Sequence, residues 1–276
     1  MAVQRVILGG LAAIVTVVMA LAAPAAERAE LRAFLEVTGF DVAITSMQQG
    51  AMAGPGLAGD APDAFGEQWV RLAEEVFDPD RMIDRALDMM AAVMPDGLVE
   101  HGMEFYASDL GMRLVAAENE SHVTPDEDRF AIGEDLVATM LADNPDRAED
   151  LRAMTNAIGG VDASVRAVIE IQLRYLLAAS AAQAGEATYS EAELRAILAE
   201  MAPQIRENIE VYSLIGSAYT YRDFSDEEVA AYLAALEHPM MQQVYEVLNA
   251  VQHEVMAERY EALAARLDEL SPQQDI

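Results

Sequence analysis

The chain contains no cysteine and no lysine, and each absence excludes a class of structure. Its 276 residues include 17 basic side chains, all of them arginine. Without cysteine there is no disulfide, so stability must come from a packed hydrophobic core or from partners. Without lysine, and without a glycine-rich loop that leads into a helix, there is no P-loop for binding nucleotide phosphates.

Positive charge is scarce overall. The chain has 48 acidic residues against its 17 arginines, and its formal net charge is −31. A negative field of this size repels nucleic acid and anionic lipid headgroups. The sequence therefore predicts no nucleic-acid partner. It favours a solvated acidic surface, with a cationic partner or loose cation binding as the alternatives.

Recognisable catalytic and metal-binding motifs are also missing. None of the four histidines has the Glu-x-x-His spacing of di-iron bundles, and there is no His-Glu-x-x-His motif, EF-hand loop or Gly-x-Ser-x-Gly elbow. Glu118 and His122 lie four residues apart, on one face of a predicted helix. We interpret them as a surface ion pair, with a metal-binding pair as the alternative. We expect no catalytic residue, no metal and no cofactor.

One long uncharged apolar run occurs, and it lies at the N-terminus. Arg5 is followed by uncharged residues over 6–23, and Ala23-Pro24-Ala25 has the small-x-small pattern that signal peptidase requires. We therefore predict a signal peptide over residues 1–25, cleaved after Ala25 or Ala26, and release into the bacterial periplasm. The alternative is an inner-membrane anchor formed by residues 6–23.

The remaining chain predicts an all-α fold. Alanine, leucine, glutamate, methionine and arginine dominate it, and the alternation typical of strands is missing. Helix starts are marked by predicted capping boxes at Ser190, Ser225 and Thr124, and by cap–proline pairs at Asp78, Asn144 and His238. The expected helices are 27–50, 63–77, 79–94, 97–107, 109–122, 125–142, 145–158, 162–184, 190–220, 226–237 and 239–269. We expect residues 49–62, rich in glycine, to form an irregular loop.

Two segments 130 positions apart have similar patterns. Residues 96–119 and 226–249 each contain a short amphipathic helix, a break and a second amphipathic helix. We interpret the chain as a multi-helix bundle built from two degenerate helical-hairpin repeats that share one core. We divide the chain into a signal peptide over 1–25, repeat 1 over 26–123, connecting helices over 124–159 and repeat 2 over 160–276. The alternative is two unrelated hairpins with ordinary helical periodicity.

Methionines and aromatic residues concentrate near these hairpins. The methionines in question are Met89, Met90, Met94, Met240 and Met241. We expect them to pack in the core, with an adaptable apolar groove or Cu(I) ligation as the alternatives. The aromatic residues around the second break are Tyr219, Tyr221, Phe224 and Tyr232. We expect them to wedge the hairpin corner, although their hydroxyls are also suited to the rim of a pocket.

One short motif resembles a known family. An acidic amphipathic helix ends in Phe105 and Tyr106, and Ser108, a short break, Gly111 and Arg113 follow. This pattern resembles that of a bacterial secreted all-helical family catalogued as domain of unknown function 2059. The resemblance covers residues 30–122 and includes Thr38-Gly39. The second hairpin departs from it, with Ala235, Leu236, His238, Met241 and Gln243 at the matching places.

The resemblance implies a secreted helical protein and no particular activity. We interpret the motif residues as structural rather than functional. Gly111 is expected to allow close packing at the corner, and Arg113 is expected to pair with a neighbouring acid such as Asp109.

Together these features predict an exported, non-enzymatic binding or envelope-maintenance protein. Its partner is open, with a protein or an apolar small molecule as candidates, and we expect contact with a membrane only through an uncleaved anchor. Two alternatives stand beside this prediction. One is a periplasmic chaperone or a carrier of lipids or other hydrophobic ligands with a methionine-rich groove, and the other is an enzyme with an unrecognised carboxylate site.

Overall fold

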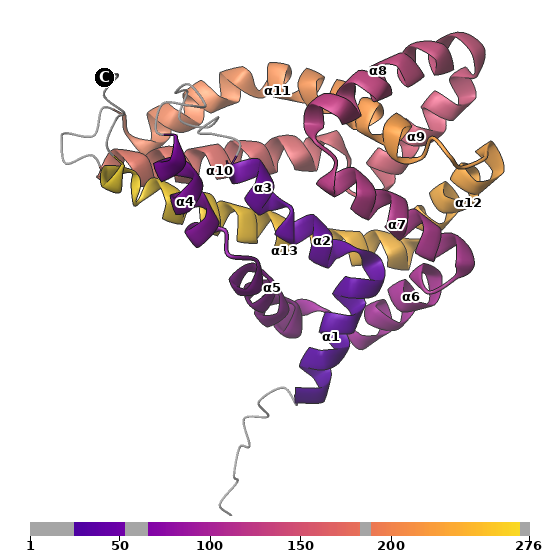
Figure 1. Ribbon diagram of the computed structural model, residues 1–276, viewed down its shortest axis with the longest axis horizontal. Coiled ribbons are helices and arrows are strands. Elements are labelled where there is room, and N and C mark those ends of the chain that lie inside the picture. Colours follow the sequence, from indigo (N-terminus) through magenta and orange to yellow (C-terminus); the bar gives the residue numbers. More distant parts are fainter. Residues whose placement is uncertain (1–24, 53–65, 183–188, 271–276) are drawn as a thin grey trace, which may run out of the picture.

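The computed structural model describes residues 25–52, 66–182 and 189–270. These residues form thirteen α-helices and one 3-10 turn, and no strand occurs among them, so the predicted all-α class is confirmed (Figure 1). None of the helices in these three ranges is both long and apolar enough to cross a membrane. The predicted signal peptide and most of the predicted loop over 49–62 lie outside the described residues.

The helices follow the predicted order closely. They are α1 Ala25–Thr38, α2 Phe40–Thr45, α3 Met47–Met52, α4 Glu67–Val76, α5 Pro79–Val93, α6 Asp96–Tyr106, α7 Asp109–Val123, α8 Asp126–Asp143, α9 Pro145–Ala157, α10 Gly160–Ala182, α11 Glu191–Thr220, α12 Asp226–Leu236 and α13 Pro239–Ala264, followed by the 3-10 turn Leu267–Glu269.

The single helix predicted over 27–50 is wrong, because it is three helices. Gly39 separates α1 from α2 with a φ of 75°, a conformation that L side chains rarely adopt. A Cβ at Gly39 would also lie 3.0 Å from the side chain of Val115, so glycine lets α7 approach closely. The predicted loop is wrong at its start, since residues 49–52 belong to α3.

Local capping explains most helix starts. The capping boxes predicted at Ser190 and Ser225 are both present, each with a glutamate three residues later. The box predicted at Thr124 is wrong. Pro125 is the N-cap of α8 and makes no side-chain cap, and the Thr124 hydroxyl donates instead to the carbonyl of Glu120, 2.8 Å away, at the end of α7.

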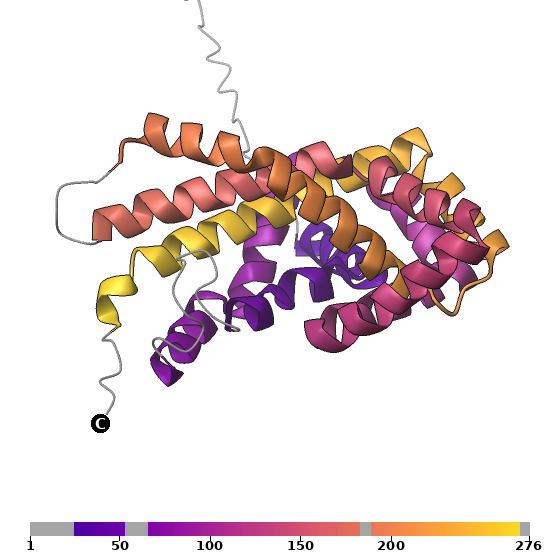
Figure 2. The ribbon, with the colours of Figure 1, turned by 90° about the horizontal axis from the view of Figure 1, so that it is seen from above.

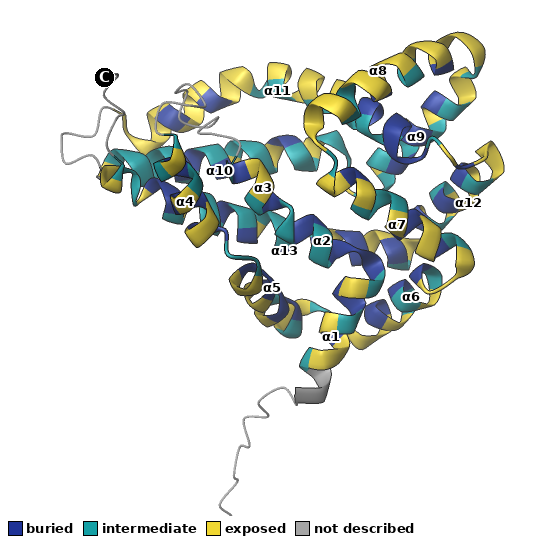
Figure 3. Cartoon of the chain, in the orientation of Figure 1, coloured by how far each residue is buried: buried dark blue, intermediate teal, exposed yellow. Residues whose placement is uncertain are grey.

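The long C-terminal helices organise the molecule. Helix α10 packs against both α11 and α13, and α13 also contacts α4, α5 and α6 (Figures 1 and 2). Helices α8 and α9 pack against α11 and against each other. Figure 3 shows that buried positions face inward and that much of α8 and α11 is exposed.

The two predicted hairpins, α6–α7 and α12–α13, share one hydrophobic core, as expected. One cluster of buried residues includes Leu98 and Leu114 from the first hairpin and Val229 and Leu248 from the second. Both hairpins break at the same place, and most aligned positions of 96–119 and 226–249 have the same degree of burial. That they arose by duplication stays a prediction.

Candidate functional site

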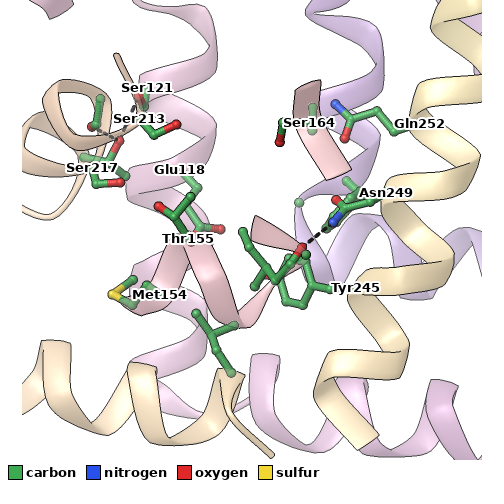
Figure 4. A pocket seen from close by; sticks show the side chains of 18 of the residues that line it. Glu118, Ser121, Met154, Thr155, Ser164, Ser213, Ser217, Tyr245, Asn249 and Gln252 are labelled. Atoms are coloured by element: carbon green, nitrogen blue, oxygen red, sulfur yellow. Dashed lines mark hydrogen bonds between the residues drawn. The ribbon is translucent and has the colours of Figure 1, made fainter. Parts of the chain in front are cut away.

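A cavity of about 390 Å³ lies where α7, α11, α12 and α13 come together, within the size range of small-molecule sites. Residues of α1, α2, α8, α9 and α10 complete its wall, so both halves of the chain contribute. Figure 4 shows side chains from several of these helices around the space. Among the described residues that line it, Glu118 is the one acid.

Glu118 lies in the cavity because it continues the buried face of α7. It follows Leu114 by four positions and Val115 by three, and both of these are buried. Its Oε1 accepts hydrogen bonds from the hydroxyl of Tyr221 at 2.7 Å and from that of Tyr232 at 2.9 Å. Its Oε2 accepts none from the described residues and is not enclosed, so it is accessible from the cavity.

Four tyrosines gather at this carboxyl group, and we call Tyr106, Tyr221, Tyr232 and Tyr245 the tyrosine cluster. They come from α6, the end of α11, α12 and α13, and all four are buried. The hydroxyl of Tyr232 lies 3.0 Å from that of Tyr106 and 3.1 Å from that of Tyr245. The hydroxyls of Tyr106 and Tyr245 are also in hydrogen-bond contact.

The proton count of this network increases the proton affinity of Glu118. The hydroxyls of Tyr106, Tyr232 and Tyr245 form three contacts with one another, and Tyr232 makes a fourth to Glu118. Each hydrogen bond uses one hydrogen, and each tyrosine supplies only one. Three hydroxyl hydrogens cannot fill four contacts. When the Glu118 carboxyl is protonated in mildly acidic solution, it supplies the fourth: the hydrogen bond to Tyr232 is then reversed, and the Tyr232 hydrogen is free for another tyrosine.

Burial shifts the pKa values in the same direction. Removal of the carboxylate from water raises the pKa of Glu118 from 4.5 to about 6, although the hydroxyls of Tyr221 and Tyr232 lower it in part. Burial also raises the pKa of each tyrosine in the cluster above its ordinary value. The tyrosines therefore stay neutral donors, and Glu118 is the member of this network that titrates near neutral pH.

The rest of the wall is rich in hydroxyl and amide groups. Ser121, Ser213, Ser217 and Thr155 lie near one another on one side, and Ser164, Asn249 and Gln252 lie on another (Figure 4). Four of these groups are already engaged. The Thr220 hydroxyl donates to Ser121 at 2.9 Å, and the Asn249 amide donates to the carbonyl of Ile158 at 2.6 Å. The hydroxyls of Thr155 and Ser164 each donate to a backbone carbonyl of their own helix at 3.3 Å. Ser213, Ser217 and Gln252 are available to a ligand with donors and acceptors of its own.

Three nitrogen-bearing side chains also line the cavity. Burial lowers the pKa of both His122 and His253, so the two imidazoles are largely neutral at pH 7. Arg129 forms an ion pair with Asp126, which offsets its charge, and its Nε is buried without a partner. Among the described lining residues, neither histidine is hydrogen-bonded to a serine, so no nucleophile–base pair is assembled.

The motif residues form the corner beside this cavity. The ring of Phe105 stacks on that of Tyr232 with centroids 5.8 Å apart, and Tyr106 belongs to the tyrosine cluster. Ser108 caps α7 by accepting from the backbone N–H of Gly111 at 3.1 Å. A Cβ on Gly111 would lie 2.6 Å from the Cα of Tyr106, so glycine allows the close packing expected there.

Two predicted contacts are wrong. Arg113 pairs with Glu228 of the second hairpin, not with Asp109, and its guanidinium lies 5.4 Å from the ring centroid of Phe224. Glu118 and His122 do not form a surface ion pair, because Glu118 turns inward to the tyrosines. No cluster of three potential metal ligands occurs in the part of the chain that the structure describes.

The structure also shows where the named aromatic residues and methionines lie. Tyr221 and Tyr232 do line the cavity with their hydroxyls near its carboxyl group, whereas Phe224 packs in the core. Met90 and Met241 are buried, and the other three named methionines, Met89, Met94 and Met240, pack against the same core. The interpretation of these methionines as core residues is therefore confirmed. The alignment of Glu118 with Leu114 and Val115 was the sequence signal that pointed to its burial.

Comparison with known proteins gives no relative. No family model, curated protein or solved structure matches the chain.

Proposed function

We propose that this chain is an exported, non-enzymatic protein that binds a small polar molecule in the cavity around Glu118. The observation that supports it is the cavity itself, in which a carboxyl group with one accessible oxygen faces a wall of hydroxyl and amide groups. Ligand sites are typically concave and largely preformed, with a few polar groups that orient the ligand.

Binding is favoured over catalysis by how the polar groups are used. Acid–base hydrolysis with paired carboxylates needs a second acid, and Glu118 is the only acidic residue among the described lining residues. Its Oε1 is held by Tyr221 and Tyr232, an arrangement suited to keeping the group in place. A carrier of purely apolar ligands is disfavoured, because the named methionines pack in the core and the cavity wall combines its apolar surface with hydroxyl, amide and carboxyl groups.

The binding function is tested by filling the cavity. Gly216 of α11 lines it, and a Cβ there meets no atom within 4 Å, so Gly216→Leu places a side chain in open space. Protein purified from cells that express the full sequence is screened by thermal unfolding against a library of small polar metabolites. We expect at least one compound to raise the Tm of the parent protein and to leave Gly216→Leu unchanged. The proposal fails if no compound stabilises the parent, or if the hits stabilise both proteins equally.

Export rests on residues 1–25 and has its own test. N-terminal sequencing of protein from the periplasmic fraction should begin at Ala26 or Glu27. Replacement of Ala23 and Ala25 by larger residues should block cleavage and keep the chain on the membrane. Recovery of uncleaved parent chain in the cytoplasm would contradict this part of the proposal.

A further inference from the structure

We infer that the ligand is a small organic ammonium ion whose N–H groups bind Oε2 of Glu118, and that in mildly acidic solution its binding releases the proton that Glu118 then holds. The inference rests on the proposed binding function and adds the class of ligand. It follows from four features of the cavity: one acid, one accessible oxygen on that acid, aromatic walls and a network short of one proton.

The charge balance of the cavity favours a cation. Glu118 is the only acid among the described lining residues, and the one arginine, Arg129, is already paired with Asp126. An anionic ligand would meet the Glu118 carboxyl without a free cationic partner, whereas an ammonium group gains a charge-assisted hydrogen bond to Oε2. The net charge of −31 also concentrates cations near the protein.

The aromatic wall supports the same class. Phe40, Tyr221, Tyr232 and Tyr245 all line the cavity, and Phe40 meets Tyr245 edge to face with centroids 5.7 Å apart. Aromatic rings stabilise a desolvated ammonium ion through their π electrons, and combined with a carboxylate they form a common recognition element for amines. The cavity, at about 390 Å³, is much larger than an ammonium group. The ligand body must therefore carry hydroxyl or amide groups that match Ser213, Ser217 and Gln252.

The proton is displaced because two positive charges compete for one carboxyl group. In mildly acidic solution without ligand, the Glu118 proton completes the hydrogen bonds of the tyrosine cluster. When the ammonium ion binds Oε2, the carboxyl O–H bond breaks, its electron pair stays on Glu118 and the proton passes to water. The tyrosine network then loses one hydrogen bond, which the new ion pair replaces.

Several other titratable groups face the same space. They are His122 on α7, Arg129 on α8, Tyr221 after α11, Tyr232 on α12, and Tyr245 and His253 on α13, and Tyr106 of α6 is hydrogen-bonded to Tyr232. The raised pKa values of the tyrosines keep their hydroxyls protonated at and below pH 7. Burial lowers the pKa of His122 and His253, and comparison with the Glu118 variant separates any proton that they take up from the ligand-linked release.

The test uses matched probes and isothermal titration calorimetry on the full protein. Glucosamine, glucose and glucuronate share one pyranose ring and differ in charge, and ethanolamine, ethylene glycol and glycolate form a smaller series. We expect the two amines to bind at least tenfold more tightly than their neutral and anionic counterparts. Glu118→Gln should weaken amine binding at least tenfold. The matched control is Glu120→Gln, which changes an exposed acid of the same helix and should have no effect.

Proton release is measured on the parent protein, and Glu118→Gln is the control for protons that His122 and His253 exchange. Near pH 5.5 the heat of amine binding should differ between two buffers of unequal ionisation heat, by an amount that reports a proton leaving the protein. Affinity should rise about tenfold from pH 5 to pH 7 as the competing proton is lost. Binding with no buffer dependence would overturn the proton displacement.

The outcomes separate this inference from the binding function. If neutral glucose or ethylene glycol binds as tightly as its amine, and Gly216→Leu alone abolishes binding, the ammonium inference is overturned and the binding function stands. If amines bind Glu118→Gln as well as they bind the parent, the inference is likewise overturned. If neither amine binds at millimolar concentration, the ammonium inference fails, and the metabolite screen with Gly216→Leu decides the binding function.

Discussion

The hydroxyl of Tyr221 lies 2.7 Å from Oε1 of Glu118, although 103 positions separate the two residues in the chain. This hydrogen bond ties the turn after α11 to the middle of α7. It also makes Glu118 part of the interior rather than of the acidic surface. The stability of the molecule should therefore depend on this contact.

Removing the Tyr221 hydroxyl should weaken the fold modestly. Tyr221→Phe keeps the buried ring and deletes one hydrogen bond to a carboxyl group, so we expect the free energy of unfolding to fall by about 1 to 2 kcal/mol. Urea unfolding at pH 7 measures this fall in the free energy of unfolding. Tyr212→Phe is the matched control, because Tyr212 is exposed, and it should change the unfolding free energy by less than about 0.5 kcal/mol. Equal effects of the two variants would contradict the role of the contact.

The pKa of Glu118 predicts a pH dependence with a definite sign. Its pKa in the folded protein, about 6, lies above its ordinary value of 4.5, so the folded state holds the proton more tightly. The stabilisation from Glu118 is complete below about pH 4.5 and is lost as the pH rises through 6, with a total loss of about 2 kcal/mol.

Comparison with Glu118→Gln isolates this contribution. The unfolding free energy of the parent protein should fall relative to that of the variant between about pH 4.5 and 7. His122 and His253 act in the opposite direction, because their lowered pKa values favour folding as the pH rises. Both histidines are present in the two proteins, so they cancel in the difference. A constant difference across this range would show that Glu118 does not titrate near 6.

Arg147 should be important for holding the Tyr221 turn. It lies on α9, and its guanidinium donates to the carbonyls of Tyr221 at 2.7 Å and Phe224 at 2.9 Å while pairing with Asp226 at 2.6 Å. Arg147→Ala leaves two carbonyls without this donor, and we expect a loss of about 2 to 3 kcal/mol in unfolding free energy.

Lysine should not rescue this position, because an ammonium group lacks the planar fork that reaches three acceptors at once. Arg147→Lys should therefore recover less than half of the loss. Arg195→Ala provides the control. That arginine is half exposed and bonds only to glutamates, so its removal should cost less than about 0.5 kcal/mol. A large effect at Arg195 and none at Arg147 would refute the assignment.

The corner between α6 and α7 should tolerate no side chain at Gly111. A Cβ there would lie 2.6 Å from the Cα of Tyr106, so Gly111→Ala must push the two helices apart, at a cost of about 2 kcal/mol or more. Gly97→Ala, in α6, meets nothing within 4 Å and should be neutral or stabilise by up to about 1 kcal/mol. Thermal unfolding of the two variants makes the comparison, and similar Tm values would contradict it.

Much of the helical order was predictable because its causes are local. The hydroxyl–carboxylate pairs at Ser190 and Ser225 act within one turn of helix, and their predicted boxes are present. The helix break at Gly39 was not predicted, because nothing nearby in the sequence shows that α7 would approach this residue. The capping box at Thr124 was also predicted wrongly, since its hydroxyl had two local partners: it could accept from a backbone N–H of α8 or donate to a carbonyl at the end of α7, and it does the latter.

The partners of charged residues were much less predictable. A four-residue spacing made Asp109 the expected partner of Arg113 and made His122 the expected partner of Glu118. Arg113 and Glu118 instead bond to residues of the second hairpin or of the turn before it, more than 100 positions away. Local spacing shows which side chains are within reach along one helix. It carries no information on which partner side chains a second helix places beside them.

Composition, periodicity and capping thus determined by themselves that this chain is helical and where most helices begin and end, because those signals act over a few residues. The tertiary structure alone decided that Glu118 is a partly buried carboxyl group at the wall of a cavity. An acid at the edge of an apolar stripe is solvated or enclosed according to what packs over it. Here Tyr106, Tyr221, Tyr232 and Tyr245 are brought over it by four separate parts of the chain, and their proximity sets its proton affinity and the chemistry of the site.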